Sequence, residues 1–464
     1  MTRRRRNGGH RPDNGTALRP GRRKVSLQGA LLWFVAAYAG AILGYLGVNA
    51  FASRLLGPGS FGYFVIAITA STIVGQLAIL GVHRAGLREA ARLQTGDDDG
   101  LRRLRRGVRA VSLVPLPAAG LGVAVVTFFL VSDQSTLARS AIAVGVGLLV
   151  VLDGQKRMCA NHLRGLGQVR FASLLEGRSG GSLVAVCQGL LVLAVFVFFP
   201  ELGLAGAVGA LAIGYTIPVF VAFRRLHRLW GHLTVRGNVF RDLKLVLTQH
   251  WRFASNQFAG YVNSVAELWL AGLFLSAVDT SQFSAAQRLS MLLVIPMVSL
   301  QVVFSPVVSR FVARNDYPTL ELLLRTGATL AALCTAVVWV PILVMPETLL
   351  GLVFGDAFRA AAPVLMLLTL GNLANVLTGL AGTALMMSHH ESVVMRVQWI
   401  SVLLRLVAGA SSAMIFGLVG LGVSAAVVTT AMMITLWAVT RRRMGISSHL
   451  TLRPSLRLMR QTAG

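Results

Sequence analysis

The sequence predicts an all-α polytopic membrane protein with about twelve transmembrane helices in two six-helix halves. Three observations lead to this prediction. The 464 residues are 55% hydrophobic and only 13% charged, with a mean hydropathy of +0.68, which is typical of membrane proteins rather than soluble domains. Apolar runs of about 20 residues, the length that crosses a bilayer, recur along the chain. Lysine and arginine are concentrated in alternate connecting segments.

Twelve apolar runs are long enough to cross about 30 Å of hydrocarbon as helices. The fourth run is the shortest, because charged residues follow it closely. The predicted spans are 28–51, 61–83, 110–131, 138–155, 179–199, 203–223, 253–275, 284–308, 327–346, 361–387, 397–416 and 420–440.

The polar segments around these spans divide the chain into five parts. Segments rich in arginine, glycine and proline are expected to be disordered and to lie close to anionic lipid headgroups. The predicted parts are a disordered basic cytoplasmic tail (1–27), an N-terminal six-helix bundle (28–223), a basic cytoplasmic linker (224–252), a C-terminal six-helix bundle (253–440) and a basic cytoplasmic tail (441–464).

The distribution of basic residues predicts the orientation in the membrane. If both termini are cytoplasmic, 39 of the 44 lysines and arginines fall in inner segments, and only Arg54, Arg139 and Arg359 fall in outer turns. Cytoplasmic loops carry such an excess of basic residues. We therefore expect a multi-pass protein of the cytoplasmic membrane with both termini inside. The net charge of +27 then reflects topology, and no nucleic-acid partner is expected.

Weak internal similarity predicts that the two halves are repeats. Phe61 aligns with Phe283 and Leu163 with Leu385, both at an offset of 222 residues. Because six spans is an even number, a duplication gives two halves with the same membrane orientation, related by an axis along the membrane normal. The turn at 57–60 should then correspond to 279–282.

The chain offers little that would support enzyme activity. It contains no phosphate-binding GxxxxGK[ST] loop and no long loop for an ATPase domain. The acids Asp133, Glu201 and Asp356 lie in short predicted turns without paired acids, so they favour solvated loops over catalysis. We expect a protein that is not an enzyme and that needs no cofactor.

Polar side chains inside the seventh span form a candidate substrate site. Asn256, Asn263 and Glu267 are spaced i, i+7 and i+11, which places the last two within about 20° of Asn256 around a helix. A charge at mid-bilayer costs about 3 kcal/mol on insertion scales, so these residues should face a cavity. Hydrogen bonds that only hold the bundle together would explain the same pattern.

Further candidates lie in other spans. Arg288 lies close enough in depth to Glu267 to form an ion pair, which would be structural or part of a substrate site. Arg405 has no acid at matching depth on the last three spans, so it is expected to face an anionic substrate or to extend to the inner surface. Asn372 and Asn375 could donate to sugar hydroxyls or bond to a neighbouring helix, and Asn49 occupies a related position in the first half.

The first predicted hairpin carries a more specific signal. Its sequence, Arg54-Leu55-Leu56-Gly57-Pro58-Gly59-Ser60-Phe61-Gly62, resembles the "aRlLGpeefG" signature of polysaccharide-export proteins of the O-antigen flippase type, within the MATE-like superfamily. The resemblance continues through Leu80, Gly81 and Arg84 and resumes at 283–314 and 351–382. The usual glutamates after the proline are replaced here by Gly59 and Ser60.

This resemblance implies a flippase that moves an undecaprenyl-diphosphate-linked oligosaccharide to the outer leaflet for cell-surface polysaccharide assembly. Arginines would bind the diphosphate, asparagines the sugars, and one half would rock against the other. The implied partners are the lipid-linked oligosaccharide, anionic membrane lipids, and a polysaccharide polymerase or glycosyltransferases. Coupling to a gradient of H+ or Na+ is left open.

Two alternatives remain open at the level of sequence. A MATE-like cation-coupled antiporter of small amphipathic compounds would use intramembrane acids, of which Glu267 is an example. A scaffold of a polysaccharide-assembly complex would need no transport activity of its own.

Overall fold

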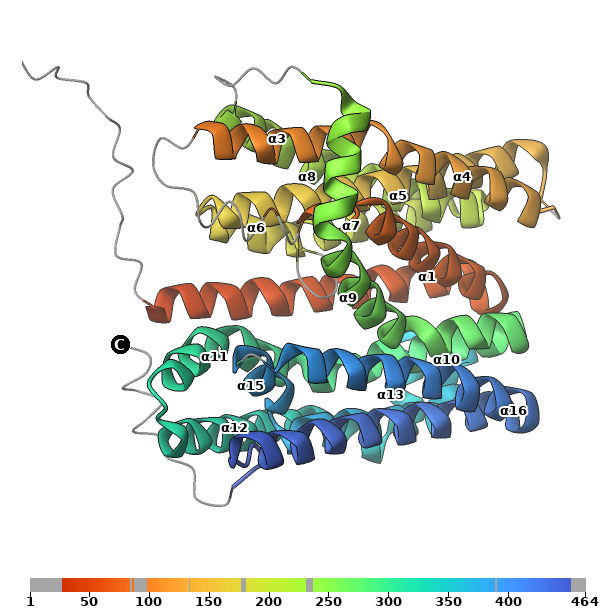
Figure 1. Cartoon of the computed structure of the whole chain (residues 1–464). Coiled ribbons are helices and arrows are strands. Elements are labelled where there is room, and N and C mark those ends of the chain that lie inside the picture. Colours follow the sequence, from red (N-terminus) through yellow and green to blue (C-terminus); the bar gives the residue numbers. More distant parts are fainter. Residues whose placement is uncertain are drawn as a thin grey trace, which may run out of the picture.

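The computed structural model describes residues 27–83, 86, 98–132, 134–176, 181–230, 237–388 and 390–451. The side chains of 27–39, 249–257 and a few single positions lie outside this description. All regular structure in the described residues is helical (Figure 1). Eight described segments are long and apolar enough to cross a membrane, and large apolar side chains such as Phe129 and Phe416 are exposed on the helices. Both findings agree with the predicted polytopic membrane protein.

The described residues of the first half form α1 (Leu27–Ala78), α3 (Asp98–Leu113), α4 (Pro115–Leu130), α5 (Thr136–Gly165), the short α6 (Val169–Leu175), α7 (Ser182–Phe198), the 3-10 helix η1 (Pro200–Leu202) and α8 (Gly203–Trp230). The second half contains α9 (Val239–Phe274), α10 (Ala277–Ser290), η2 (Met291–Val294), α11 (Ile295–Ala313), α12 (Tyr317–Val344), α13 (Pro346–Phe354), η3 (Asp356–Ala361), α14 (Ala362–Thr378), α15 (Ala381–Met387) and α16 (Glu391–Met444).

Two of these helices are each a pair of helices that meet at a glycine. The backbone of Gly57 in α1 has φ 65°, and that of Gly417 in α16 has φ 60°. Glycine adopts this left-handed region without the steric cost that other residues incur. Both helices reverse direction at these residues (Figure 1). The Leu-Leu-Gly-Pro sequence therefore forms the tight hairpin that was predicted.

The two halves form two helical layers, with the first part of α1 between them and α9 crossing from one to the other (Figure 1). We call the end where α1 and α16 reverse the hairpin end. The opposite end, where α3 and the last turns of α8 and α16 carry arginines, is the basic end. The start of α1 and the end of α16 both lie at the basic end (Figure 1).

At the hairpin end the two halves share one hydrophobic core. The Phe61 ring of α1 lies 6.4 Å from that of Phe354 and 5.7 Å from that of Phe358, between centroids. The Ser53 hydroxyl donates to the Phe354 carbonyl over 3.0 Å, and the Ser281 hydroxyl donates to the carbonyl of Pro58. These contacts close the molecule at this end.

At the basic end each half packs around a core of its own. One buried cluster joins α1, α3, α5, α6 and α8 of the first half, with Val246 of α9 added to it. Another joins α11, α12, α14 and α15 of the second half. Among the described residues of these two clusters, Val246 is the one that joins the halves here, so they are held together mainly at the hairpin end.

The structure differs from the sequence-based boundaries in three places. The turn in the second half lies between α9 and α10, where the Ser276 hydroxyl accepts from the Asp279 amide. Residues 279–282 are therefore helical and do not match the turn at 57–60. The predicted linker is largely helical, since α8 continues to Trp230 and α9 begins at Val239. The tenth predicted span is interrupted at Gly379. Most of the predicted tails 1–27 and 441–464 lies outside the described residues.

Gly62 lies where α1 closely approaches the start of α10. A β-carbon at Gly62 would lie 2.6 Å from the Ala277 carbonyl oxygen, whereas one at Gly59 would meet no atom within 4 Å. Gly62→Val should therefore push the halves apart at the hairpin end and destabilise the fold by about 1–3 kcal/mol. Thermal unfolding of the purified protein in detergent measures this loss.

Gly59→Val is the matched control, and it should change the stability by no more than about 0.5 kcal/mol. Equal losses for the two variants would contradict the close approach at Gly62.

Candidate functional site

A cavity of about 980 Å³ lies between the two halves. Residues of α1, α5, α7 and α8 line it from the first half, and residues of α9, α10, α14 and α16 line it from the second. Its lining extends toward the basic end, to Glu176 and α15. The volume is at the upper end of the range of about 300–1,000 Å³ for ligand pockets. The cavity is therefore large enough for a ligand much bigger than an ion.

The charged lining of this cavity is mainly basic. It comprises five basic side chains and three acids, which are Lys156, Arg157, Arg164, Arg288, Arg405, Asp153, Glu176 and Glu267. Charges at membrane depth are costly unless they are paired or face a polar cavity. The excess of cations makes the cavity suited to an anionic ligand.

Arg405 of α16 forms an ion pair with Glu267 of α9. Its guanidinium also donates to the Asn263 side-chain oxygen over 3.1 Å and to the Thr429 hydroxyl over 2.8 Å. Both charged side chains are almost fully buried. The predicted pairing of Glu267 with Arg288 is therefore wrong. The acid that neutralises Arg405 comes from α9, which is distant in sequence, so inspection of the last three spans alone did not reveal it.

Arg288 of α10 has a different environment. Its Nε donates to the side-chain oxygen of Asn49 on α1, and its guanidinium carbon lies 5.1 Å from the centre of the Tyr45 ring. Arg288 is only 4% exposed, yet its Nη2 atom has no hydrogen-bond partner among the described residues. A buried guanidinium nitrogen without a partner is unfavourable. This atom is available to an anionic ligand in the cavity.

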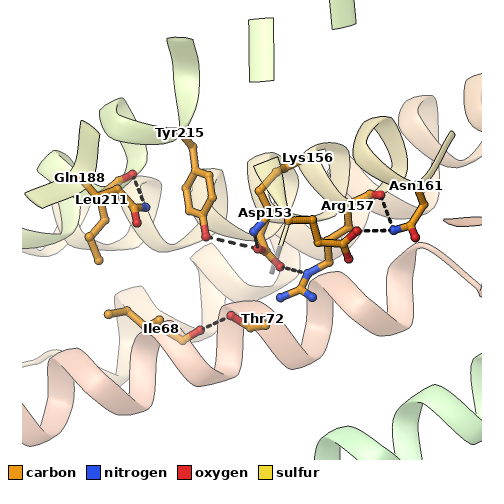
Figure 2. Close-up of polar contacts among 10 residues, drawn as sticks. Ile68, Thr72, Asp153, Lys156, Arg157, Asn161, Gln188, Leu211 and Tyr215 are labelled. Carbon is orange, nitrogen blue, oxygen red and sulfur yellow. Dashed lines mark hydrogen bonds and ion pairs between the residues drawn. The ribbon is translucent and has the colours of Figure 1, made fainter. Parts of the chain in front are cut away.

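The first half contributes a charged cluster on α5, shown in Figure 2. Asp153 accepts from the Lys156 ammonium over 2.7 Å and from Arg157 Nε over 2.7 Å. The Tyr215 hydroxyl of α8 donates to the same carboxylate over 3.2 Å. One acid therefore faces two bases, which leaves an excess positive charge. Asp153 and Arg157 lie one helical turn apart on α5, and Lys156 and Tyr215 complete the cluster around the carboxylate.

The cluster continues toward the basic end of the cavity. The Asn161 amide donates to the Glu176 carboxylate over 2.6 Å, and Arg164 lies 3.8 Å from the same carboxylate. Figure 2 places Asn161 beyond Arg157 along α5. Polar side chains thus line one face of α5 over several turns.

The predicted asparagines lie at different positions around the site. Asn263 donates to the Gln398 carbonyl over 2.9 Å, and Asn372 donates to the Ser290 carbonyl over 3.0 Å. Asn375 and Asn49 also line the cavity. The side chain of Asn256 lies outside the described part of α9. Seven of the eight predicted side chains thus line one cavity, and their role in substrate binding stays a prediction.

Several lining residues were not predicted from the sequence. They are Gln188, Tyr215, Gln287, Gln301, Gln398 and Thr429. Uncharged polar residues in an apolar span are common where helices hydrogen-bond to each other. A single residue of this kind therefore does not indicate a binding site. Among the described residues no group of three histidine, cysteine or acidic side chains could hold a metal ion.

Comparisons with known proteins support the predicted resemblance. No family model matches the chain. A protein of Haloferax volcanii, named probable low-salt glycan biosynthesis flippase Agl15, is 23% identical over 407 residues, which cover 85% of this chain and 79% of that protein.

Similar solved structures are MATE transporters. The inward-facing conformation of a multidrug resistance MATE family transporter of the MOP superfamily has a TM-score of 0.63 at 15% identity, and covers 89% of this chain and 98% of that one. An outward-facing conformation has a TM-score of 0.55 at 15% identity, covering 91% and 97%. The fold is that of the MATE-like transporters.

The ion pair between Glu267 and Arg405 should be important for stability. Arg405→Gln leaves the buried Glu267 carboxylate without a counter-ion, which typically costs about 3–5 kcal/mol. Combining it with Glu267→Gln removes both charges and should restore part of this loss. Thermal unfolding of the single and double variants in detergent gives the coupling between the two sites.

The exposed pair between Arg102 and Asp99 on α3 supplies the control. Arg102→Gln should cost at most about 1 kcal/mol. If the double variant at the buried pair were less stable than both single variants, the pairing would not explain the loss.

Proposed function

We propose that this protein is a flippase that translocates polyprenyl-diphosphate-linked oligosaccharide across the cytoplasmic membrane for cell-surface polysaccharide assembly. The main observation in favour is a cationic cavity between two halves that are joined at one end. Within it, the Nη2 atom of buried Arg288 finds no hydrogen-bond partner in the described part of the chain. A diphosphate carries negative charge, which would balance the excess of basic side chains, and oxygen atoms that could accept a hydrogen bond from Arg288. The name of the Haloferax volcanii relative agrees with a glycan-lipid cargo.

In this proposal Arg288 binds the diphosphate directly. A guanidinium presents a fixed fork of N–H donors that matches phosphate oxygens. Arg157 supports it from the first half, because Asp153 can neutralise only one of its two basic neighbours. Arg405 also faces the cavity, but in this conformation it is paired with Glu267. We therefore propose that Arg405 contributes less to diphosphate binding than Arg288 does.

The amides of the cavity are proposed to bind the oligosaccharide. Asn372 and Asn375 lie one helical turn apart on α14, and Gln398 of α16 and Asn263 of α9 line the same cavity. Amide groups both donate and accept hydrogen bonds, as sugar hydroxyls do. This grouping gives a polar path alongside the cationic part of the cavity.

The charge pattern favours this cargo over that of a cation antiporter. Asp153 and Glu267 are each paired with basic side chains, so neither offers a free carboxylate to a cationic compound. A scaffold without transport activity would have no use for a buried polar cavity, which is costly in a membrane.

We further propose twelve membrane crossings with the basic end in the cytoplasm. The eight apolar segments become twelve when α1 and α16 are each counted as two crossings and when α7 and α9 are added. In this orientation the cavity is closed toward the outside, which is consistent with the higher TM-score to an inward-facing transporter. Outward transport then requires the contacts at the hairpin end to open.

The orientation can be tested with single cysteines. A cysteine at Ser135, at the hairpin end, should react with a membrane-impermeant thiol reagent in intact cells. A cysteine at Asn238, at the basic end, should react only after the membrane is permeabilised. The native cysteines Cys159, Cys187 and Cys334 are unpaired, so they are first replaced by alanine. The opposite labelling pattern would reverse the proposed orientation.

Substitution of Arg288 tests the anion site. Arg288→Ala should lower glycan export about 10- to 100-fold, since a hydrogen bond to a charged group contributes about 1.5–3 kcal/mol. Arg288→Lys keeps the charge but loses the fork, so it should retain part of the activity. Leaflet-resolved labelling of the lipid-linked glycan, in cells depleted of the native protein, measures export.

Arg310→Ala is the control, because Arg310 is exposed on α11 and does not line the cavity. It should export at the parental rate. Parental export by Arg288→Ala at equal abundance in the membrane would refute the substrate role of Arg288.

A further inference from the structure

A second, smaller groove lies on the outside of the protein between α1 and α13. Its volume is about 330 Å³, and it is lined by Leu43, Leu46, Gly47, Ala50, Phe51, Arg54, Leu352 and Val353. We propose that this α1–α13 groove binds an anionic phospholipid of the leaflet at the hairpin end, with an acyl chain in the groove and the phosphate on Arg54.

The groove and the cavity lie on opposite faces of the same helix. The cavity is lined by residues 41, 42, 45, 48 and 49 of α1, whereas the groove is lined by residues 43, 46, 47, 50 and 54. With 3.6 residues per turn these two sets point in different directions. Helix α1 therefore separates the polar cavity from an apolar groove that faces the lipid.

The groove has the length of one membrane leaflet. From Leu43 to Arg54 the helix rises about 16 Å at 1.5 Å per residue, and half of the hydrocarbon core is about 15 Å thick. Arg54 lies three residues before Gly57, where α1 reverses. An acyl chain that follows the groove from mid-membrane would thus bring its headgroup to the level of Arg54.

The floor of the groove is open at Gly47. A β-carbon there would have no neighbouring atom within 4 Å, and the walls include the exposed side chains of Leu43 and Leu352. A void against apolar side chains forfeits their dispersion contacts. An acyl chain is the molecule that the surrounding bilayer supplies to fill it.

Arg54 gives the groove its charge preference. One Nη2 donor bonds to the Leu352 carbonyl, and a guanidinium has five N–H donors in all. Among the described residues no acid forms an ion pair with Arg54, because the nearby Asp356 pairs with Arg359 over 2.7 Å. The remaining donors suit the phosphate of a lipid that carries a net negative charge.

The groove exists only while the halves are closed at the hairpin end. Its walls come from α1 of the first half and α13 of the second, and Arg54 itself bridges them. A lipid bound to both walls stabilises the closed arrangement, because a ligand favours the state that it binds. The phospholipid would therefore oppose opening at this end, which the proposed transport cycle requires.

The polyprenyl tail of the cargo is the competing occupant. Its headgroup would lie in the cavity, on the other face of α1, and the helix stands between the two sites. A single molecule in the closed conformation cannot place its headgroup in the cavity and its tail in this groove without crossing α1. This geometry favours a phospholipid.

Photo-crosslinking tests the groove directly. The full-length protein is placed in nanodiscs of phosphatidylcholine that contain a small fraction of phosphatidylglycerol with a photoactivatable acyl chain. Crosslinks should map to residues 43–51 and 352–353. Gly47→Phe fills the groove and should abolish these crosslinks, whereas Gly122→Phe, at an exposed glycine that also meets no neighbour, should leave them unchanged.

The charge preference has its own variants. Arg54→Gln should reduce crosslinking by phosphatidylglycerol about tenfold, to the level of the matching phosphatidylcholine probe, and Arg54→Lys should retain part of the preference. Arg139→Gln, at another turn of the hairpin end, should have no effect. Unchanged crosslinking in Gly47→Phe, or an equal preference in Arg54→Gln, would overturn the proposal.

Two further measurements separate this proposal from the proposed function. Arg288→Ala should crosslink as the parent does even where export is lost, so a failed flippase assignment leaves the groove intact. Polyprenyl phosphate is then added as a competitor. If it displaces the probe at lower mole fraction than phosphatidylglycerol does, the groove is a cargo site and the phospholipid assignment is wrong.

Discussion

The packing of the first hairpin against α13 and η3 is the contact on which the rest of the structure depends. Phe61 packs with Phe354 and Phe358 in a cluster of three rings, and the nearby polar contacts use main-chain carbonyls that any sequence provides. Because the halves share a core at this end and keep separate cores at the other, the space between them becomes a cavity closed on one side. The same contact creates the groove outside α1.

Electrostatics within the cavity follows from this geometry. Buried charges need partners or solvent, and the two buried arginines Arg405 and Arg288 differ in the partners that they have. Arg405 has an acid, an amide and a hydroxyl, whereas Arg288 has one amide oxygen and an aromatic ring. This inequality separates a residue whose charge is satisfied by the protein from one that is suited to a ligand. The depth of Arg288 and Arg405 in the membrane does not by itself show this difference.

Helix α1 connects these features. One face carries Tyr45 and Asn49 toward the cavity, the opposite face carries Gly47 toward lipid, and its end carries the hairpin. A change in its position would alter the anion site, the groove and the closure together.

The sequence by itself determined the helical membrane fold, the sharp turn at Gly57 and the set of polar residues that face inward, because hydropathy, glycine conformation and the cost of buried charge act locally. It also placed Asn49, Glu267, Arg288 and Arg405 among the residues of interest. The tertiary structure alone decided which of them are partners. Glu267 and Arg405 are separated by 138 residues, as Asn49 and Arg288 are by 239, and no periodicity along one helix reports the depth and rotation of another. The turn between α9 and α10 was likewise placed by the Ser276 cap and not by the internal repeat.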